Sequence, residues 1–261
     1  MAKYHVSADG NPRICKAAEG KCPFGGNEAH FTSKEAARAA FEESVVASES
    51  STKKASSRES IRTTDALGDT VWLNSDGKRH RDGDLPAVES KDGRKVWYQN
   101  GKIHREGDLP AYVDAAGTKQ WFRNNERHRD GDLPAIEGAD GVKSWYQNDK
   151  QHRDGDLPAV ERQDGTKYWF RNGKLHRDGD RPAVEEADGT KRWYQNGERH
   201  RDGDQPAIEY ADGYKIWYRN GDLHRGGGLP AVEKADGTKE WWVKDVFQYR
   251  ILPDGTRTKH Q

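Results

Sequence analysis

Apolar and aromatic side chains occur along most of the chain in short groups that lie between Gly-containing dipeptides. One group, "TKYWFR" at 166–171, is bounded by Asp164-Gly165 and Asn172-Gly173 and is short and aromatic enough for a single strand. The residues from there to the next Asp-Gly contain "KLHR", "DGDR" and "PAVE". We expect a short strand, a corner and a second strand there, with the proline at the start of the last strand. The pattern therefore predicts a small β unit.

The dipeptides Asp-Gly and Asn-Gly predict how these strands are joined. Both favour the two-residue hairpin turn in which the two central residues have positive φ. Where Asn-Gly changes, it becomes Asn124-Asn125 or Asn148-Asp149, which still tolerate that backbone. We therefore expect a tight hairpin at each dipeptide.

The groups recur with a period of 24 residues, and seven copies follow one another. A small unit of this kind cannot bury its own apolar face, so copies must stack. The predicted fold class is mainly β, a repetitive β-hairpin solenoid or elongated sheet of 24-residue repeats preceded by a small α-containing N-terminal module. Tryptophans and histidines at fixed positions are interpreted as its structural ladder: Trp97, Trp121, Trp145, Trp169, Trp193 and Trp217, with His104, His128, His152, His176, His200 and His224.

Composition along the chain predicts four segments. Residues 1–46 form a small module with one helix, because Thr32 and Glu35 fit a capping box before "SKEAARAAFEESVVA". The Ser-rich, charged stretch 47–65 is predicted to be a flexible linker. The repeats occupy 66–245, and 246–261, where the repeat pattern gives way to apolar residues, is expected to cap the array.

Strand alternation separates each tryptophan from the aromatic residue after it. Lysine stands two places before tryptophan in every copy from Lys95 onward, so we expect a lysine over the indole. The residue directly before tryptophan varies freely, which favours an exposed edge on that face. The aromatic residues after tryptophan are the candidate binding face: Tyr98, Phe122, Tyr146, Phe170, Tyr194 and Tyr218.

The cluster His176, Arg177, Asp178 and Asp180 would suggest a catalytic or metal centre if it occurred once. Because it recurs in successive copies, whereas an active site needs one asymmetric pocket, we interpret it as structural. In this interpretation the arginine bridges to a neighbouring aspartate and the histidine is half-buried against the next copy. The copy with Gly226–Gly228 is then expected to lose its bridge. Calcium is an alternative, although two carboxylates offer fewer oxygens than calcium takes.

Four residues near the N-terminus, His5, Cys15, Cys22 and His30, are candidate ligands for structural zinc, the one cofactor that the sequence suggests. A module this small needs stabilisation beyond its own core. Two other hypotheses stay open, namely reduced cysteines packed as small apolar residues and a Cys15–Cys22 disulfide.

Charge and motifs restrict the function further. The 44 basic and 44 acidic residues balance, and the copy at 145–168 has four basic and five acidic residues, so we expect no nucleic-acid partner. The sequence contains no Gly-rich phosphate loop, serine elbow or H-E-x-x-H, so we expect no enzyme activity. It also lacks a signal peptide and an apolar run of transmembrane length, and we expect a cytoplasmic protein.

The repeat "DGTKYWFRNGKLHR" resembles the MORN type in its order of turn, aromatic strand and turn. It differs in having Arg177 where that family has glycine, and in a period that is one residue longer. The repeats are also similar to tandem WYxNGxxHR repeats of viral and bacterial proteins, and "CPFGG" followed by "HF" resembles the start of assorted bacterial and phage proteins.

These resemblances imply a non-enzymatic scaffold that binds a protein partner or, in some MORN members, lipid head groups. They also imply a phage or bacterial origin, with a place in the virion or the host cytoplasm. Two alternatives come from the residues themselves. One is carbohydrate binding by the aromatic side chains, and the other is a small metal-dependent effector in the N-terminal module.

Overall fold

The computed structural model describes residues 4–6, 12–14, 36 and 60–259, and the chain divides into two units, Met1–Glu59 and Ser60–Gln261. In the first unit, β1 (Tyr4–Val6) pairs antiparallel with β2 (Pro12–Ile14). The predicted N-terminal helix lies outside the described residues except for Ala36, whose backbone is helical. The predicted linker also lies outside them as far as residue 59, and the first strand of the second unit begins at Ile61.

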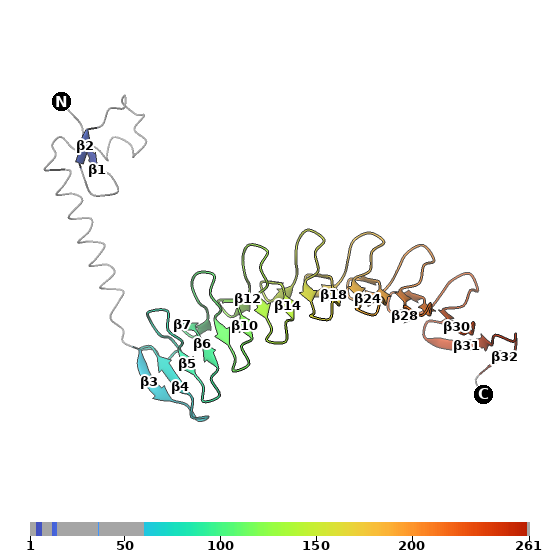
Figure 1. The fold of residues 1–261 in the computed structure, drawn as a ribbon, viewed down its shortest axis with the longest axis horizontal. Coiled ribbons are helices and arrows are strands. Elements are labelled where there is room, and N and C mark those ends of the chain that lie inside the picture. Colours follow the sequence, from blue (N-terminus) through green and yellow to red (C-terminus); the bar gives the residue numbers. More distant parts are fainter. Residues whose placement is uncertain (1–3, 7–11, 15–35, 37–59, 260–261) are drawn as a thin grey trace. The chain divides into compact units, whose positions relative to one another are not determined.

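The second unit contains an antiparallel sheet of 18 strands that pair in chain order (Figure 1). Its first half consists of β3 (Ile61–Thr64), β4 (Thr70–Leu73), β5 (Val88–Glu89), β6 (Lys95–Val96), β9 (Tyr112–Val113), β10 (Lys119–Gln120), β13 (Ile136–Glu137), β14 (Lys143–Ser144) and β17 (Val160–Glu161). Its second half consists of β18 (Lys167–Tyr168), β21 (Val184–Glu185), β22 (Lys191–Arg192), β25 (Ile208–Glu209), β26 (Lys215–Ile216), β29 (Val232–Glu233), β30 (Lys239–Val243), β31 (Val246–Ile251) and β32 (Arg257–Thr258). We call it the continuous sheet.

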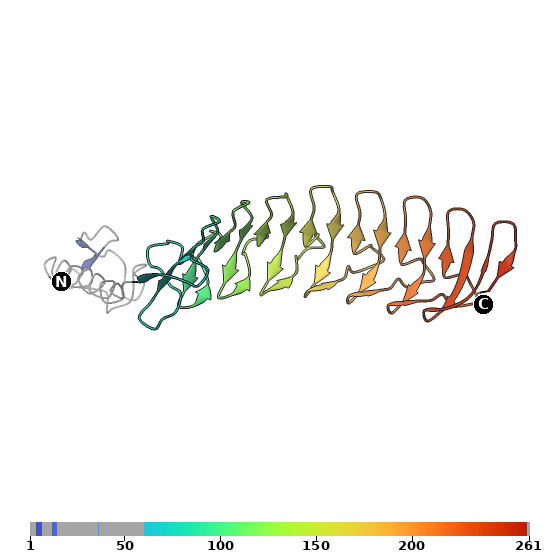
Figure 2. The same cartoon turned by 90° about the horizontal axis from the view of Figure 1, so that it is seen from below.

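The Asn-Gly turns form a second set of strands, in separate two-stranded hairpins. These are β7 (Tyr98–Gln99) with β8 (Lys102–Ile103), β11 (Phe122–Arg123) with β12 (Glu126–Arg127), β15 (Tyr146–Gln147) with β16 (Lys150–Gln151), β19 (Phe170–Arg171) with β20 (Lys174–Leu175), β23 (Tyr194–Gln195) with β24 (Glu198–Arg199), and β27 (Tyr218–Arg219) with β28 (Asp222–Leu223). Figure 2 shows the two rows of strands along the array. The prediction of a mainly β array of repeated hairpins is therefore confirmed.

From Trp97 to Trp217 each aromatic group is divided at its tryptophan into two strands, so the single strand expected at 166–171 is wrong, whereas β4 and β30 run through Trp72 and Trp241. The Trp169 N–H donates to the Ala183 carbonyl at 2.8 Å, whereas the Trp169 carbonyl accepts from the His176 N–H at 3.0 Å. The first bond extends the pairing of the continuous sheet, and the second extends the Asn-Gly hairpin. The chain passes from one row of strands to the other at the tryptophan.

The two dipeptides form different turns. At Asn172-Gly173 both residues have positive φ, 51° and 80°, as predicted. At Asp164-Gly165 only the glycine does, at 92°, and the two-residue turn predicted there is wrong. The Asp164 carboxylate accepts the Thr166 N–H at 2.8 Å, which keeps Asp164 out of the left-handed region and leaves that conformation to Gly165.

Replacing Asn172 with valine is expected to lower the free energy of unfolding by about 1–2 kcal/mol, because a β-branched residue is strained at positive φ. Asn172→Gly is the control and is expected to change it by a few tenths of a kcal/mol. Equilibrium unfolding in urea measures both. Equal stability of the valine and glycine variants would contradict the assigned turn.

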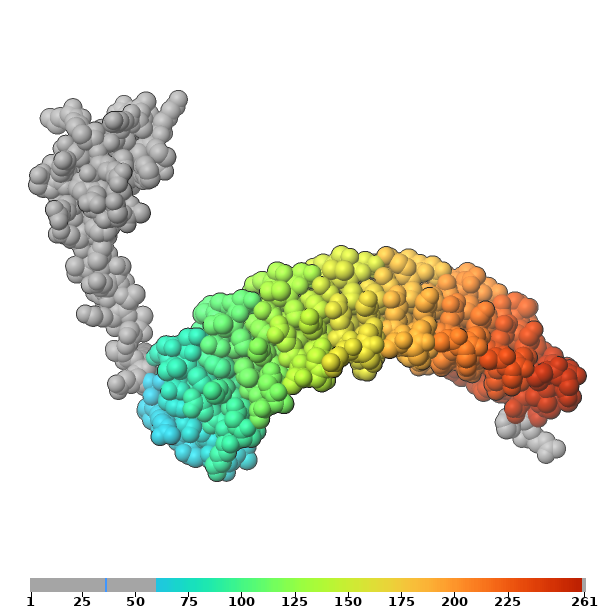
Figure 3. All heavy atoms as spheres, viewed as in Figure 1, coloured from blue at the N-terminus to red at the C-terminus, as the bar shows by residue number. Residues whose placement is uncertain are grey.

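Consecutive Asn-Gly hairpins contact each other through the backbone. The N–H of the second turn residue donates to the carbonyl just before the histidine of the preceding copy, as Gly173 does to Gln151 at 2.9 Å. The same bond recurs from Gly101 to Arg79 and from Gly221 to Arg199. Figure 3 shows the copies following one another without a break from residue 60 onward.

The core is thin and repeats with the sequence. Each copy buries its tryptophan and the alanine that follows proline, as in Trp169 and Ala183, which are 5% and 0% exposed. Apolar clusters lie near the two ends of the continuous sheet: Val71, Val88 and Val96 at one, and Ile208, Ile216 and Val232 at the other. No helix within the described part of the chain has the length and apolar run needed to cross a membrane.

The variable residue before tryptophan is buried in three copies and partly buried in the other four, so it does not form an exposed edge. Val96, Ser144 and Ile216 are only 4%, 7% and 8% exposed, since a strand pairs on each side of them. Where the residue is charged it finds a partner, as Arg192 does with Glu186 at 2.6 Å. The expectation fails because a core one residue thick accepts many side chains at this position.

Candidate functional site

The arginine after each histidine lies over the indole of its own copy. The guanidinium carbon is 3.6–4.0 Å from the ring centroid in seven copies: Arg81 on Trp72, Arg105 on Trp97, Arg129 on Trp121, Arg153 on Trp145, Arg177 on Trp169, Arg201 on Trp193 and Arg225 on Trp217. The lysine expected over the indole is instead exposed, as at Lys167, which pairs across the sheet with Glu185. The cation–π contact on the tryptophan was therefore predicted with the wrong residue, because the cation is arginine and not lysine.

The same guanidinium joins consecutive copies. Arg153 donates through Nε and Nη2 to both oxygens of Asp132 in the preceding copy, at 2.7 and 3.1 Å, and through Nη1 to the Pro158 carbonyl and Glu161 at 3.3 and 3.0 Å. The Arg–Asp bridge expected from the sequence thus spans six junctions: Arg105–Asp84, Arg129–Asp108, Arg153–Asp132, Arg177–Asp156, Arg201–Asp180 and Arg225–Asp204.

The copy with Gly226–Gly228 keeps its bridge, contrary to expectation, because the partner of Arg225 is Asp204 of the preceding copy. The loss of an aspartate at Gly228 affects only the following copy. There Tyr249 stands in the arginine position and stacks on Trp241, with ring centroids 4.6 Å apart. A tyrosine thus covers Trp241, the last tryptophan in the 24-residue register.

A second contact between copies depends on backbone conformation. Where the second Asp of the loop has positive φ, its carbonyl accepts from the Nε1–H of the next tryptophan at 3.1 Å: Asp84 to Trp97, Asp132 to Trp145, Asp156 to Trp169 and Asp204 to Trp217. Asp108 and Asp180 are not among the residues with positive φ, and Nε1 of the following Trp121 and Trp193 is buried without a partner. The left-handed aspartate therefore places the acceptor for the indole.

Each histidine of the ladder up to His200 uses both ring nitrogens, Nδ1 toward the next copy and Nε2 within its own copy. Nδ1 accepts the N–H of the Asn that opens the next Asn-Gly turn, as His176 does from Asn196 at 3.1 Å. A nitrogen that accepts carries no proton, so the proton of the neutral ring is on Nε2. Nε2 then donates to the carboxylate two residues on, as from His176 to Asp178 at 3.0 Å. In the structure the histidines up to His200 therefore link the hairpin turn of the next copy to a carboxylate of their own copy.

The interface aspartates have lowered pKa values. The hydrogen bond from the arginine of the next copy is the main cause and holds the pKa below the ordinary value of 3.8 at Asp84, Asp108, Asp132, Asp180 and Asp204. A carboxylate with a lowered folded-state pKa contributes stability above its unfolded pKa and loses it as the pH falls through the folded value.

We therefore expect the thermal midpoint to fall as the pH decreases below about 4, where these carboxylates take up protons. The Asp132→Asn variant removes one of them and is expected to reduce the size of this fall. Calorimetry between pH 6 and 2 measures both proteins. A midpoint that stays constant down to pH 2 would contradict the role of the Arg–Asp bridges.

Pockets recur at the junctions between copies. They measure about 330, 390, 150 and 450 Å³ at the junctions where Tyr98, Tyr146, Phe170 and Tyr218 lie. Each is lined by the His-Arg-Asp-Gly-Asp loop of one copy and by the aromatic residue, histidine and arginine of the next.

All six residues of the candidate binding face, Tyr98, Phe122, Tyr146, Phe170, Tyr194 and Tyr218, are partly buried. They open the Asn-Gly hairpins, one in each copy. A guanidinium from the preceding copy covers one face of three rings: Arg79 on Tyr98, Arg127 on Tyr146 and Arg199 on Tyr218, at 5.4, 4.5 and 5.1 Å. One face of each of these three rings is therefore occupied by a guanidinium.

A row of exposed leucines beside the pockets was missed in the sequence. Leu85, Leu109, Leu133, Leu157 and Leu229 are 42–47% exposed and occupy one position in five copies. The sequence signal for this row was a leucine directly before Pro-Ala in five copies, at a corner where a polar residue is usual. In the other two copies Arg181 and Gln205 take this place.

Three of the four candidate zinc ligands lie outside the described residues. His5 belongs to β1, opposite Arg13, whereas Cys15, Cys22 and His30 lie outside the described residues. Within the described ranges, no three His, Cys, Asp or Glu side chains are placed to hold a metal ion. The zinc site stays a prediction.

The chain matches no protein-family model, and no curated protein matches it. The resemblance to MORN repeats therefore remains a prediction from the sequence.

Proposed function

We propose that the repeat array is a non-enzymatic scaffold that binds a protein partner along its junction pockets. The observation that carries the proposal is the row of leucines. A single exposed leucine is ordinary on a protein surface, but the same exposure at one position in five copies, each beside a pocket, forms a strip of apolar surface. The resemblance to MORN repeats supports the same class of function.

The spacing of the strip suggests what the partner presents. Each copy adds two strands to the continuous sheet, so Leu85, Leu109, Leu133 and Leu157 advance by about 10 Å per copy. An α-helix places every seventh residue about 10.5 Å apart, and an extended chain places every third residue at about the same spacing. Exposed carboxylates follow the strip, among them Glu106 and Asp154 at 80% and 82% exposure. The partner therefore carries regularly spaced apolar side chains next to basic ones.

The test is affinity capture from host lysate with the full chain and two matched variants. One variant changes Leu85, Leu109, Leu133 and Leu157 to serine, and the control changes the exposed lysines Lys95, Lys119, Lys143 and Lys167 to serine. We expect proteins captured by the wild type and the lysine control to be lost from the leucine variant. Capture that is the same with all three would overturn the proposal.

The alternatives predict other results. A carbohydrate-binding module would be retained on polysaccharide, and Tyr98→Ala or Phe122→Ala would abolish that retention. A metal-dependent effector would lose its activity with Cys15→Ser and keep it in the leucine variant.

A further inference from the structure

In four consecutive copies an exposed aspartate is held by two side chains of its own copy. The histidine two residues before it bonds one oxygen, and the residue seven before it bonds the other. In the Trp145 copy, His152 contacts Asp154 Oδ1 at 3.0 Å and Gln147 donates to Oδ2 at 2.8 Å. Asp130, Asp178 and Asp202 are held in the same way, by Arg123, Arg171 and Gln195 together with their histidines.

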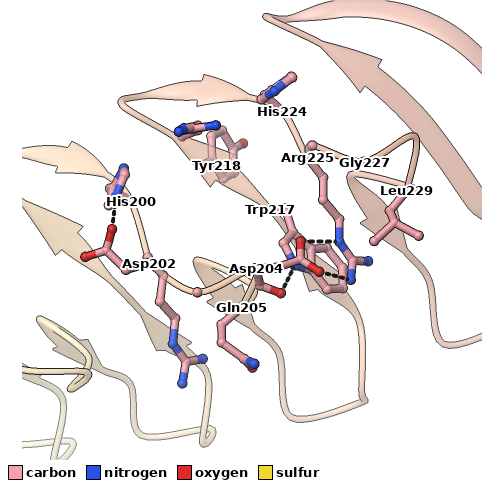
Figure 4. A pocket seen from close by; sticks show the side chains of 14 residues that line it. His200, Asp202, Asp204, Gln205, Trp217, Tyr218, His224, Arg225, Gly227 and Leu229 are labelled. Atoms are coloured by element: carbon pink, nitrogen blue, oxygen red, sulfur yellow. Dashed lines mark hydrogen bonds and ion pairs between the residues drawn. The ribbon is translucent and has the colours of Figure 1, made fainter.

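The Trp217 copy keeps the two donors and lacks the acid. Its donors are Arg219 and His224, and Gly226 stands where the aspartate belongs. Figure 4 shows His200 joined to Asp202, whereas His224 has no such partner. Within the described residues the Arg219 side chain makes no hydrogen bond or ion pair, and the Asp202 carboxylate near it is already bound by His200 and Gln195.

His224 is also free on its other side. In the preceding copies Nδ1 accepts an asparagine N–H, but Lys244 occupies that position here, and His224 Nδ1 is buried with no partner among the described residues. No hydrogen bond to Nδ1 therefore decides which ring nitrogen carries the proton, and the ring can donate through Nε2.

There is room where the aspartate side chain is missing. A Cβ added at Gly226 would have no heavy atom within 4 Å, and the backbone φ there is not positive. The pocket lined by Arg219, His224 and Gly226 measures about 450 Å³, against about 330, 390 and 150 Å³ for the pockets that hold an acid at this position. Leu229 and Tyr218 supply apolar wall beside the donors.

We propose that the pocket of Arg219, His224 and Gly226 binds a ligand carboxylate in the place that an aspartate side chain fills in the four preceding copies. At the same two positions of other copies an arginine and a histidine hold the two oxygens of one carboxylate, that of Asp130 or Asp178. Gly226 removes a methylene and a carboxylate, so acetate is the smallest matching probe. This proposal is independent of the proposed protein binding by the leucine strip, because its test needs no protein partner.

The experiment titrates the full chain with acetate and follows the ring nitrogens of His224 by NMR, assigned through His224→Gln. We expect saturable shifts with a dissociation constant on the order of 1–10 mM, as suits a ligand of four heavy atoms. Gly226→Asp should abolish the shifts, because the new side chain fills the site. Arg219→Gln, the residue found at this position in two of the four copies, should weaken binding at least threefold.

A reciprocal variant tests whether the geometry alone makes the site. Asp178→Gly exposes Arg171 and His176 in the Phe170 copy and should create a second acetate site that shifts His176. The proposal is overturned if acetate leaves His224 unshifted, if Gly226→Asp binds acetate as the wild type does, or if phosphate binds and acetate does not.

The carboxylate could belong to a small acid or to the end of a peptide, and two further probes distinguish these sources. An apolar tripeptide with a free C-terminal carboxylate should bind at least tenfold more tightly than acetate if chain ends are the ligand, and its C-terminal amide should not bind. Equal affinity of the tripeptide and acetate would assign the site to small carboxylic acids.

Discussion

Arg153→Ala is expected to lower the free energy of unfolding by about 2–3 kcal/mol. The Arg153 side chain is 13% exposed, and its guanidinium lies 3.8 Å from the Trp145 ring centroid while bonding Asp132, Glu161 and the Pro158 carbonyl. Alanine removes the stacking and leaves two carboxylates without their cation. The loss stays below that of a fully buried ion pair, because Asp132 is 55% exposed and regains water.

Two variants separate the causes of this effect. Arg153→Lys keeps the charge but not the planar fork, and we expect it to recover less than half of the lost stability. Arg171→Ala removes an arginine that is 49% exposed and is expected to cost less than about 0.5 kcal/mol. Urea unfolding measures all three. Equal losses for Arg153→Ala and Arg171→Ala would show that the stacked bridge has no special role.

Trp169→Ala is expected to have the largest effect of any single change, a loss of about 3–5 kcal/mol. The ring is 5% exposed, donates through Nε1 to the Asp156 carbonyl at 3.1 Å and carries Arg177 on its face. Removing it leaves a cavity at the residue where the chain passes between the two rows of strands. Because each copy contacts only its neighbours, the damage should stay at these junctions and divide one unfolding transition into two.

The matched control is Trp241→Ala at the end of the array. Trp241 is only partly buried and is stacked by Tyr249 instead of an arginine, so we expect a loss of about half that of Trp169→Ala. Calorimetry of both variants measures the midpoints and the number of transitions. Equal losses at the two positions would contradict a core built from interior junctions.

The sequence predicts the period, the Asn-Gly hairpins and the Arg–Asp bridge, because each depends on residues close in the chain or repeated in register. Asn172 and Gly173 show positive φ for reasons local to the turn. The sequence does not predict that the strand divides at Trp169. The division depends on two hydrogen bonds of the Trp169 backbone, one to Ala183 on the side of the continuous sheet and one from His176 on the side of the hairpin. The turn at Asp164-Gly165 was predicted wrongly because its conformation depends on one hydrogen bond, from the Thr166 N–H to the Asp164 carboxylate.

The junction pockets could not be predicted, since their walls come from two copies. Periodicity predicts that Lys167 and Trp169 share a strand face, whereas in the structure Lys167 is exposed, Trp169 is buried and Arg177 covers the indole. Likewise Gly226 appears in the sequence as the loss of a structural residue, and only the contacts of Asp178 show what that loss leaves open.

The two rows of strands differ in how firmly they join the copies, and this gives the array a preferred direction of bending. One row is a continuous ladder of paired strands, whereas successive Asn-Gly hairpins meet through a backbone bond such as that from Gly173 to Gln151 and a bond to a histidine ring such as that from Asn172 to His152. Tension along the array should therefore separate the Asn-Gly hairpins first, while the continuous sheet keeps its length. The array should bend so that the hairpin row lengthens and the continuous sheet does not.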